Sequence, residues 1–144
     1  MICAISKDRL IKNKYYLGSV TGKIFTFWIK ELLTLFQNSS KKYFICDNST
    51  VHHVKEIEYL FDDIIHEIMY LSPYSPQLNP IESLFSKWKI GVKRHRLTSR
   101  DNLLNRIKES QRLITVDDCQ HWIKHSSKYL SICLKKEPLS NELL

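Results

Sequence analysis

Glycine and proline are scarce in this sequence of 144 residues, with only three Gly and four Pro. Linkers, collagens and low-complexity chains are rich in these residues, so the composition excludes those classes. Hydrophobic residues make up 43% of the chain, which is ordinary globular composition and excludes wholesale disorder. A chain of this length is expected to form one domain with a core of its own.

Long apolar runs and paired cysteines are missing as well. No stretch reaches the roughly 18 uninterrupted apolar residues of a membrane-spanning helix. Residues 1–8 lack a basic lead and a long apolar run, so we expect no signal peptide. The expected location is the nucleus in a eukaryote and otherwise the cytoplasm. No two of the four cysteines form a C-x-x-C pair, and all four are expected to be buried, reduced thiols: Cys3, Cys46, Cys119 and Cys133.

Positive charge is in excess. The chain has 22 Lys and Arg against 15 Asp and Glu, which gives a net charge of +7. A compact domain this basic is typical of proteins that meet a polyanion, either nucleic acid or an anionic membrane surface.

Apolar periodicity predicts the first elements. Residues 2–6 and 11–20 are predicted as strands joined by a polar turn at residues 7–9. Apolar residues from Phe25 to Phe36 recur at helical spacing, which predicts an amphipathic helix. Residues 42–47 form a short apolar run that ends in an acid, the pattern of a buried strand.

A parallel crossover follows. Apolar residues between Val54 and Phe61 predict a helix, and residues 64–71 predict the next strand. The segment 42–71 is about the minimum length for a right-handed strand–helix–strand crossover. Further helices are predicted over residues 81–92, over residues 101–114 and after Thr115, where Thr-Val-Asp-Asp has the form of a capping box. This order predicts an α/β fold with a mixed sheet.

Two acidic residues are candidates for a metal site. Asp47 ends one predicted parallel strand, and Glu82 lies in the first turn of the helix after the next strand. Because the carboxyl ends of parallel strands share one edge, both carboxylates are expected to face one cleft. Carboxylate oxygens suit hard cations such as Mg²⁺. The alternative is that Asp47 caps the following helix, and that Asn79 to Glu82 forms a capping box.

Two stretches resemble the mariner-type DDE transposases. They are ICDNSTVHH over residues 45–53 and LSPYSPQLNPIESLFSKWKIGVKR over residues 71–94. In that family, an Asp-Asn pair followed by His ends the fourth strand of a ribonuclease-H-like sheet. A Ser-Pro-x-x-Asn-Pro-x-Glu element then opens the helix that carries the last acid. The matching residues are Asp47, Asn48, His52, Ser75, Pro76, Asn79, Pro80 and Glu82, and the family uses the spacing of thirty-four residues between the two acids.

The resemblance implies a function and a division of the chain. The family cuts and rejoins DNA strands during transposition and integration, with Asp47 and Glu82 as catalytic ligands of Mg²⁺ or Mn²⁺ in a two-ion site. Residues 1–96 are expected to form a partial ribonuclease-H-like core, and residues 97–144 a helical extension of the same domain. The alternative function is a non-catalytic DNA-binding remnant or a regulatory fragment of a transposase.

The family's first catalytic Asp has no counterpart here. Residues 2–6 resemble the family's second strand, no acid precedes them, and the nearest carboxylate, Asp8, is expected in the hairpin turn. We therefore expect an N-terminally truncated domain that lacks the central first strand, which leaves strand edges open. Either the two halves close directly, or a second chain supplies a strand in a homo-oligomer.

The remaining candidate residues are basic or aromatic. A basic run on and beyond the helix of Glu82 is predicted to contact DNA phosphates; the alternative is an ordinary solvated face. Its members are Lys87, Lys89, Lys93, Arg94 and Arg96. Trp88, on the apolar stripe of that helix, is expected in the core.

Asn48 and His52 are also predicted to lie at the DNA. His52 either contacts the scissile phosphate or orients Asp47. His121 and His125 have the i, i+4 spacing of a metal pair, but without a third ligand they are expected to be ordinary surface residues.

Overall fold

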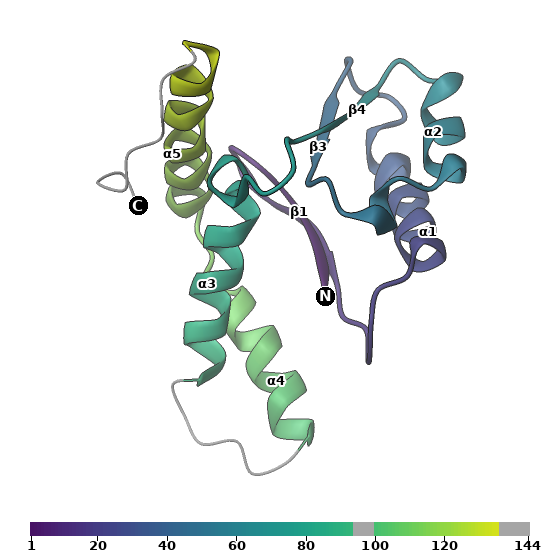
Figure 1. Ribbon diagram of the computed structural model, residues 1–144. Helices are drawn as coiled ribbons and strands as arrows, with labels where there is room; N and C mark the ends of the chain where they lie inside the picture. Colours follow the sequence, from purple (N-terminus) through teal and green to yellow (C-terminus); the bar gives the residue numbers. More distant parts are fainter. Residues whose placement is uncertain (94–99, 136–144) are drawn as a thin grey trace. The chain divides into compact units, whose positions relative to one another are not determined.

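The computed structural model describes residues 1–93 and 100–135 (Figure 1). It divides into two compact units, which are described separately. The first unit contains Met1–Ile2 and Lys12–Asn79, and the second contains Cys3–Ile11 and the chain from Pro80 onward.

The first unit is built from two helices and a pair of strands. Its helices are α1 (Gly22–Leu33) and α2 (Lys55–Asp62), and its strands are β3 (Tyr43–Cys46) and β4 (Glu67–Tyr70). Three 3₁₀ helices connect them: η1 (Thr34–Phe36), η2 (Thr50–His52) and η3 (Pro76–Leu78).

Helix α1 forms because its apolar residues recur at helical spacing. The residues of this stripe are buried: Phe25, Trp28, Ile29 and Leu32. The side chain of Thr21 caps the helix by accepting a hydrogen bond from the Ile24 N–H at 3.4 Å. The sequence predicted a single helix to Phe36, but the last turn tightens into η1.

The predicted parallel crossover is confirmed. Strands β3 and β4 run parallel, with Phe44 opposite Ile68 and Cys46 opposite Tyr70, and α2 connects them. The ring of Phe44 packs edge-on against those of Phe36 and Phe61, with centroids 5.4 and 5.5 Å apart. The two strands therefore end at the same edge, which follows directly from their register.

The strands are shorter, and the sheets smaller, than the sequence predicted. Within residues 1–93 and 100–135, β1 (Ile2–Ser6) pairs with β2 (Arg9–Lys14) in one two-stranded sheet, and β3 pairs with β4 in another. The strand expected over 11–20 ends at Lys14. Gly18 has a φ of +92°, a left-handed conformation that does not continue an extended strand. The fold is thus a mixed α/β fold with small sheets.

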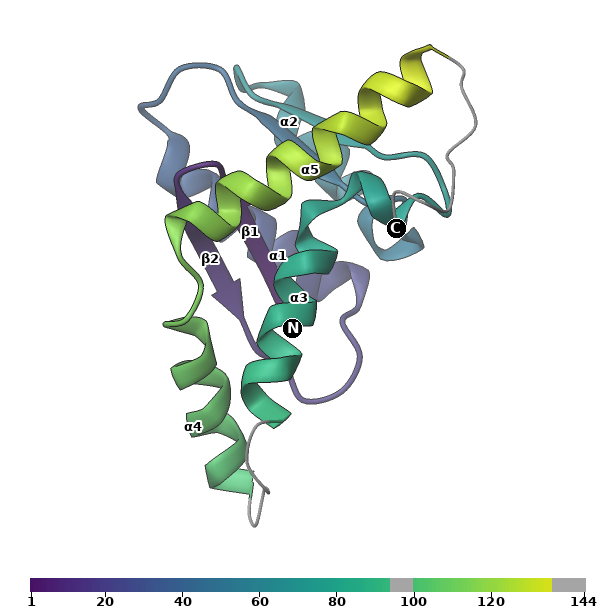
Figure 2. The same cartoon turned by 90° about the vertical axis from the view of Figure 1, so that its left-hand side faces the viewer.

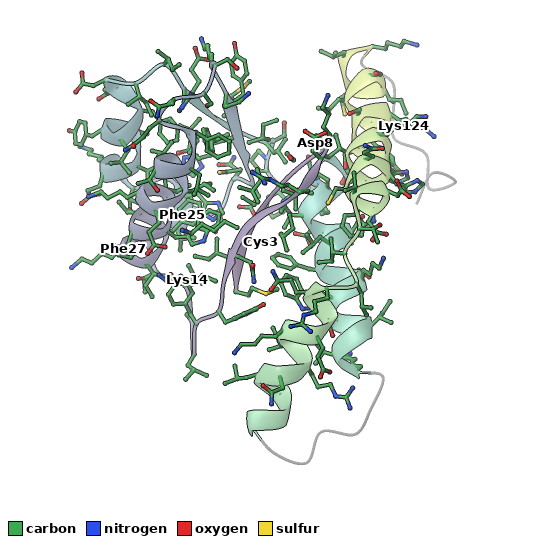
Figure 3. All side chains as sticks on the ribbon, turned by 180° about the vertical axis from the view of Figure 1, so that it is seen from behind. Cys3, Asp8, Lys14, Phe25, Phe27 and Lys124 are labelled. Atoms are coloured by element: carbon green, nitrogen blue, oxygen red, sulfur yellow. The ribbon has the colours of Figure 1, made fainter. Side chains whose placement is uncertain are left out.

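The second unit contains three helices and most of the β1–β2 hairpin. The helices are α3 (Pro80–Lys93), α4 (Arg100–Gln111) and α5 (Val116–Leu134), and α3 packs against both of the others (Figures 1 and 2). Trp88 is buried, as expected, and its indole N–H donates to the Ile107 carbonyl at 2.9 Å. Asp8 lies in the hairpin turn, as expected (Figure 3).

The predicted capping box at Thr115 is present. The Thr115 hydroxyl accepts from the Asp118 N–H at 3.2 Å, and the Asp118 carboxylate accepts from the Thr115 N–H at 2.8 Å. These bonds satisfy backbone donors that the helix cannot pair internally, and so fix where α5 begins.

The cysteines are free thiols with different exposures. Cys119 is fully buried, whereas Cys3 and Cys46 are half-buried. The expectation of burial is wrong for Cys133, which is exposed near the end of α5. Burial raises the pKa of Cys46 to about 12, and the neighbouring Asp47 carboxylate adds to the rise. Such thiols stay protonated and weakly reactive at neutral pH. In the part of the chain that the structure describes, no helix is long and apolar enough to cross a membrane.

Close contact between α3 and α4 depends on Gly91. A Cβ atom at this position would lie 2.8 Å from the Ser110 hydroxyl oxygen and 2.9 Å from the Ser110 Cβ. We expect Gly91→Ala to destabilise the protein by roughly 1–3 kcal/mol, although alanine is the better helix former. Urea unfolding should show that Gly91→Ala/Ser110→Gly loses less stability than the sum of its single substitutions. Additive losses would contradict this contact.

Candidate functional site

Asp47 follows the last residue of β3, and a local hydrogen bond and a nearby imidazole orient its carboxylate. Oδ1 accepts from the Ser49 N–H at 3.0 Å and lies 2.8 Å from Nδ1 of His52. The side chain is still 47% exposed, so the carboxylate is both oriented and open to solvent. Asp47 does not cap α2: the N-cap position of that helix is Val54, without a side-chain hydrogen bond.

His52 makes contacts through its ring, its Nδ1 atom and its backbone carbonyl. Its side chain is only 16% exposed, and its ring packs against that of Phe25 on α1, with centroids 4.0 Å apart. Figure 3 labels Phe25 on its helix. The Tyr70 hydroxyl donates to the His52 carbonyl at 2.9 Å. The imidazole beside Asp47 therefore packs against α1, and the His52 backbone is held by a hydrogen bond from the end of β4.

Asn48 and His53 form a second pair in the same loop. The Asn48 side-chain oxygen is in hydrogen-bond contact with Nε2 of His53. The His53 ring packs against the Tyr70 ring, with centroids 4.1 Å apart, and Tyr70 is opposite Cys46 in the strand register. The structure thus brings together Asp47, Asn48 and both histidines around the carboxyl ends of β3 and β4.

Glu82 lies in the first turn of α3, in the second unit, and is exposed. Burial raises the pKa of Cys3, on β1, to about 12, and the negative charge of Glu82 contributes to the rise. Within the second unit, the Glu82 carboxylate therefore lies within electrostatic range of the beginning of β1.

A family model for DDE superfamily endonucleases matches residues 1–104. The chain belongs to the DDE superfamily endonucleases. This endonuclease family implies DNA as the substrate, and its members generally use divalent metals. A search of curated proteins found no match. The matched residues include Asp47, Glu82 and α3.

Within this DDE superfamily endonuclease, the lysines of α3 divide into two groups. Lys89 and Lys93 are exposed. Lys87, predicted with them as a DNA contact, is half-buried and forms an ion pair with Asp118 of α5. That lysine holds α3 against α5, so its charge is partly neutralised within the protein. The predicted contacts Arg94 and Arg96 lie outside the described residues.

The histidine pair on α5 is a surface feature, as expected. His121 and His125 are exposed, and their rings stack with centroids 6.4 Å apart. Among the described residues, no group of three or more His, Cys, Asp or Glu could hold a metal ion.

Phe25 and Tyr70 are the residues around Asp47 that sequence reasoning missed. Phe25 was predicted only as a core residue of a helix, and Tyr70 only as part of a strand. A signal for Tyr70 was present, because residues that end neighbouring parallel strands meet at one edge. No sequence signal predicts that Phe25 packs on His52, since that contact depends on how α1 packs.

The ion pair of Asp118 gives the endonuclease a pH-dependent contact. Partial burial opposes the shift, but hydrogen bonds from Lys87 and Thr115 lower the pKa of Asp118. A lowered folded-state pKa stabilises the protein at neutral pH, and the stabilisation is lost as the pH falls below about 4.

We expect Asp118→Asn to lower the free energy of unfolding by roughly 1–2 kcal/mol at neutral pH. On acidification, this variant should lose less stability than the unsubstituted chain. Urea unfolding at neutral and acidic pH measures both effects. The matched control is Asp117→Asn, in the same turn but exposed, which should keep the full acid dependence. Equal acid dependence in the two variants would contradict the role of Asp118.

Proposed function

We propose that this DDE superfamily endonuclease is the catalytic domain of a mariner-like transposase with a ribonuclease-H-like fold. Its reaction is the metal-dependent cleavage and joining of DNA strands in transposition and integration. The family match and the paired motifs around Asp47 and Glu82 support this function. The observation that carries it is the oriented, half-exposed carboxylate of Asp47 at the carboxyl end of a parallel strand.

We propose Asp47 and Glu82 as the catalytic carboxylates that hold Mg²⁺ or Mn²⁺. Both present oxygen ligands, which these hard cations prefer, and both are accessible to solvent. A bound pair of ions would supply activation of water and stabilisation of the leaving oxygen. The protein's own contribution is to fix the Asp47 carboxylate through Ser49 and His52 before an ion arrives.

A non-catalytic DNA-binding remnant is the second candidate. It is favoured by the lack of a three-ligand cluster among the described residues and of an acid in residues 1–6. Two ions carry about four positive charges, of which two carboxylates neutralise only about half. A binding function without cleavage would follow from that imbalance.

Metal binding tests whether the two acids form one site. We expect Asp47→Ala and Glu82→Ala each to weaken Mn²⁺ binding about tenfold or more, measured by electron paramagnetic resonance titration. If the residues share an ion, the double variant should bind no more weakly than the weaker single variant. Asp8→Ala, in the hairpin turn, is the control and should bind like the unsubstituted chain. Unchanged affinity in both single variants would overturn the metal site.

Nicking of supercoiled plasmid by the same proteins tests whether the non-catalytic remnant can be excluded. With only two carboxylates, the 144-residue chain is expected to show little Mg²⁺-dependent cleavage. Strong nicking that is lost in Asp47→Ala and in Glu82→Ala would show that the two carboxylates suffice, and would exclude the non-catalytic remnant.

The open strand edges support a fuller ribonuclease-H-like sheet. In the described part of the chain, β3 and β4 pair only with each other, so their outer edges carry backbone groups without a strand partner. Two-stranded parallel sheets are marginal alone, and such edges accept further strands. We propose that a strand from the same polypeptide or from a second copy pairs there. A eukaryotic host would place the protein in the nucleus, with its DNA substrate.

We propose Lys89 and Lys93 as phosphate contacts, because both are exposed on the helix that begins with the Glu82 turn. Arg94 and Arg96 continue this basic run in the sequence. Asn48, exposed in the loop after β3, is the proposed contact beside the reacting strand. Lys87 contributes less, since it is paired with Asp118.

Salt dependence tests the α3 contacts. Each Lys–phosphate contact adds about 0.9 to the slope of log affinity against log salt, so Lys89→Ala/Lys93→Ala should lower the slope by about 2. The control Lys124→Ala/Lys128→Ala removes the same charge from exposed positions on α5 (Figure 3 labels Lys124) and should change the slope less. Fluorescence anisotropy with duplex DNA measures both. Equal changes in the two variants would show that only net charge matters.

A further inference from the structure

We infer that His52 is a positioning residue for Asp47: Nδ1 donates to the Asp47 carbonyl oxygen, which holds the imidazole 2.8 Å from Oδ1 of the carboxylate. The inference rests on the proposed function, since it concerns how a metal-binding carboxylate is presented. Of the two roles that the sequence left open for His52, the geometry points to orientation of Asp47.

The contacts of the Asp47 carboxylate fall on one of its two oxygens. Oδ1 receives the Ser49 N–H at 3.0 Å and lies 2.8 Å from His52 Nδ1. Among the described residues, no donor bonds to Oδ2. One hydrogen bond and one close imidazole contact on the same oxygen restrict rotation of the carboxylate, so Oδ2 is presented in one direction. Preorganised oxygen ligands lose less conformational entropy when a cation binds.

The backbone also determines which nitrogen of His52 faces the carboxylate. Nδ1 lies 3.2 Å from the Asp47 carbonyl oxygen as well as 2.8 Å from Oδ1. Two oxygens around one nitrogen favour a protonated Nδ1, because each can accept and neither can donate. The neutral ring is then the Nδ1–H tautomer, with its lone pair on Nε2.

The surroundings keep the imidazole in this place. Phe25 is buried and packs on the His52 ring at 4.0 Å, and Tyr70 holds the His52 carbonyl at 2.9 Å. The imidazole is only 16% exposed, too little for a freely rotating phosphate contact. Outer partners that orient metal ligands typically contribute 10–100-fold to metal affinity.

Nuclear magnetic resonance reads the tautomer directly, without metal or substrate. At about pH 8, where most imidazoles are neutral, long-range ¹H–¹⁵N spectra should show His52 as the Nδ1–H tautomer. The signals are assigned by their loss in His52→Asn. Asp47→Ala keeps the backbone carbonyl that accepts from Nδ1, so this variant should retain the Nδ1–H tautomer. An Nε2–H tautomer in the unsubstituted chain would overturn the inference.

Mn²⁺ affinity then tests the consequence for the carboxylate. His52→Ala should weaken Mn²⁺ binding about tenfold. His52→Asn should restore much of it, because the Asn amide nitrogen takes nearly the place of Nδ1, whereas His52→Gln, whose amide lies nearer the place of Nε2, should not. His121→Ala removes an exposed imidazole on α5 and should change nothing. Thermal unfolding of each variant shows whether weaker Mn²⁺ binding comes from loss of the fold or from loss of the hydrogen bond alone.

The outcomes distinguish this inference from the proposed function. If Mn²⁺ binding does not depend on Asp47, the proposed metal site fails whatever His52 does. If binding depends on Asp47 but is the same in His52→Ala, the positioning role fails and the metal site stands. If His52→Ala binds weakly and His52→Asn no better, His52 acts as a direct ligand or through packing, and the hydrogen-bond role is wrong.

Discussion

The parallel pairing of β3 with β4 is the constraint on which the proposed site depends. Because Cys46 and Tyr70 are opposite in the register, the loop that begins at Asp47 leaves the sheet beside the Tyr70 side chain. Tyr70 uses this proximity twice, donating its hydroxyl to the His52 carbonyl and packing its ring on His53. A shift of one residue in register would turn Tyr70 to the other face and remove both contacts.

Some charged residues of the second unit join its helices, and others are exposed at its surface. Lys87 and Asp118 join α3 to α5, and the same Asp118 completes the capping box with Thr115. One carboxylate therefore fixes both the start of α5 and its packing on α3. The cost is that one lysine of the basic run is partly neutralised, which leaves Lys89 and Lys93 as its exposed described members.

Much of the fold could be predicted because it depends on local pattern. The stripe through Phe25 and Trp28 gave α1, and the Thr115 motif gave the cap of α5. The parallel crossover followed from element order and length. What failed was set by tertiary context: the strand after Lys14 stops early, and Cys133 is exposed although apolar residues surround it in the sequence.

The site was predictable as a set of residues but not as a set of contacts. Asp47, Asn48 and His52 could be named from motif spacing, whereas the pairing of Lys87 with Asp118 joins residues on two helices that no spacing rule relates. Likewise, the packing of Phe25 on His52 joins two segments that are separated in sequence by β3.

The spacing between Asp47 and His52 has a physical reason in the loop. Asp47 turns the chain through its bond to the Ser49 N–H, and η2 then winds Thr50 to His52 into one 3₁₀ turn. A 3₁₀ helix advances three residues per turn, so each residue points about 120° from the one before it. His52 therefore points back at Asp47, while His53 points to Asn48 and Tyr70. An imidazole one position earlier or later would miss the carboxylate, so five residues is the separation at which this turn lets a histidine support the acid.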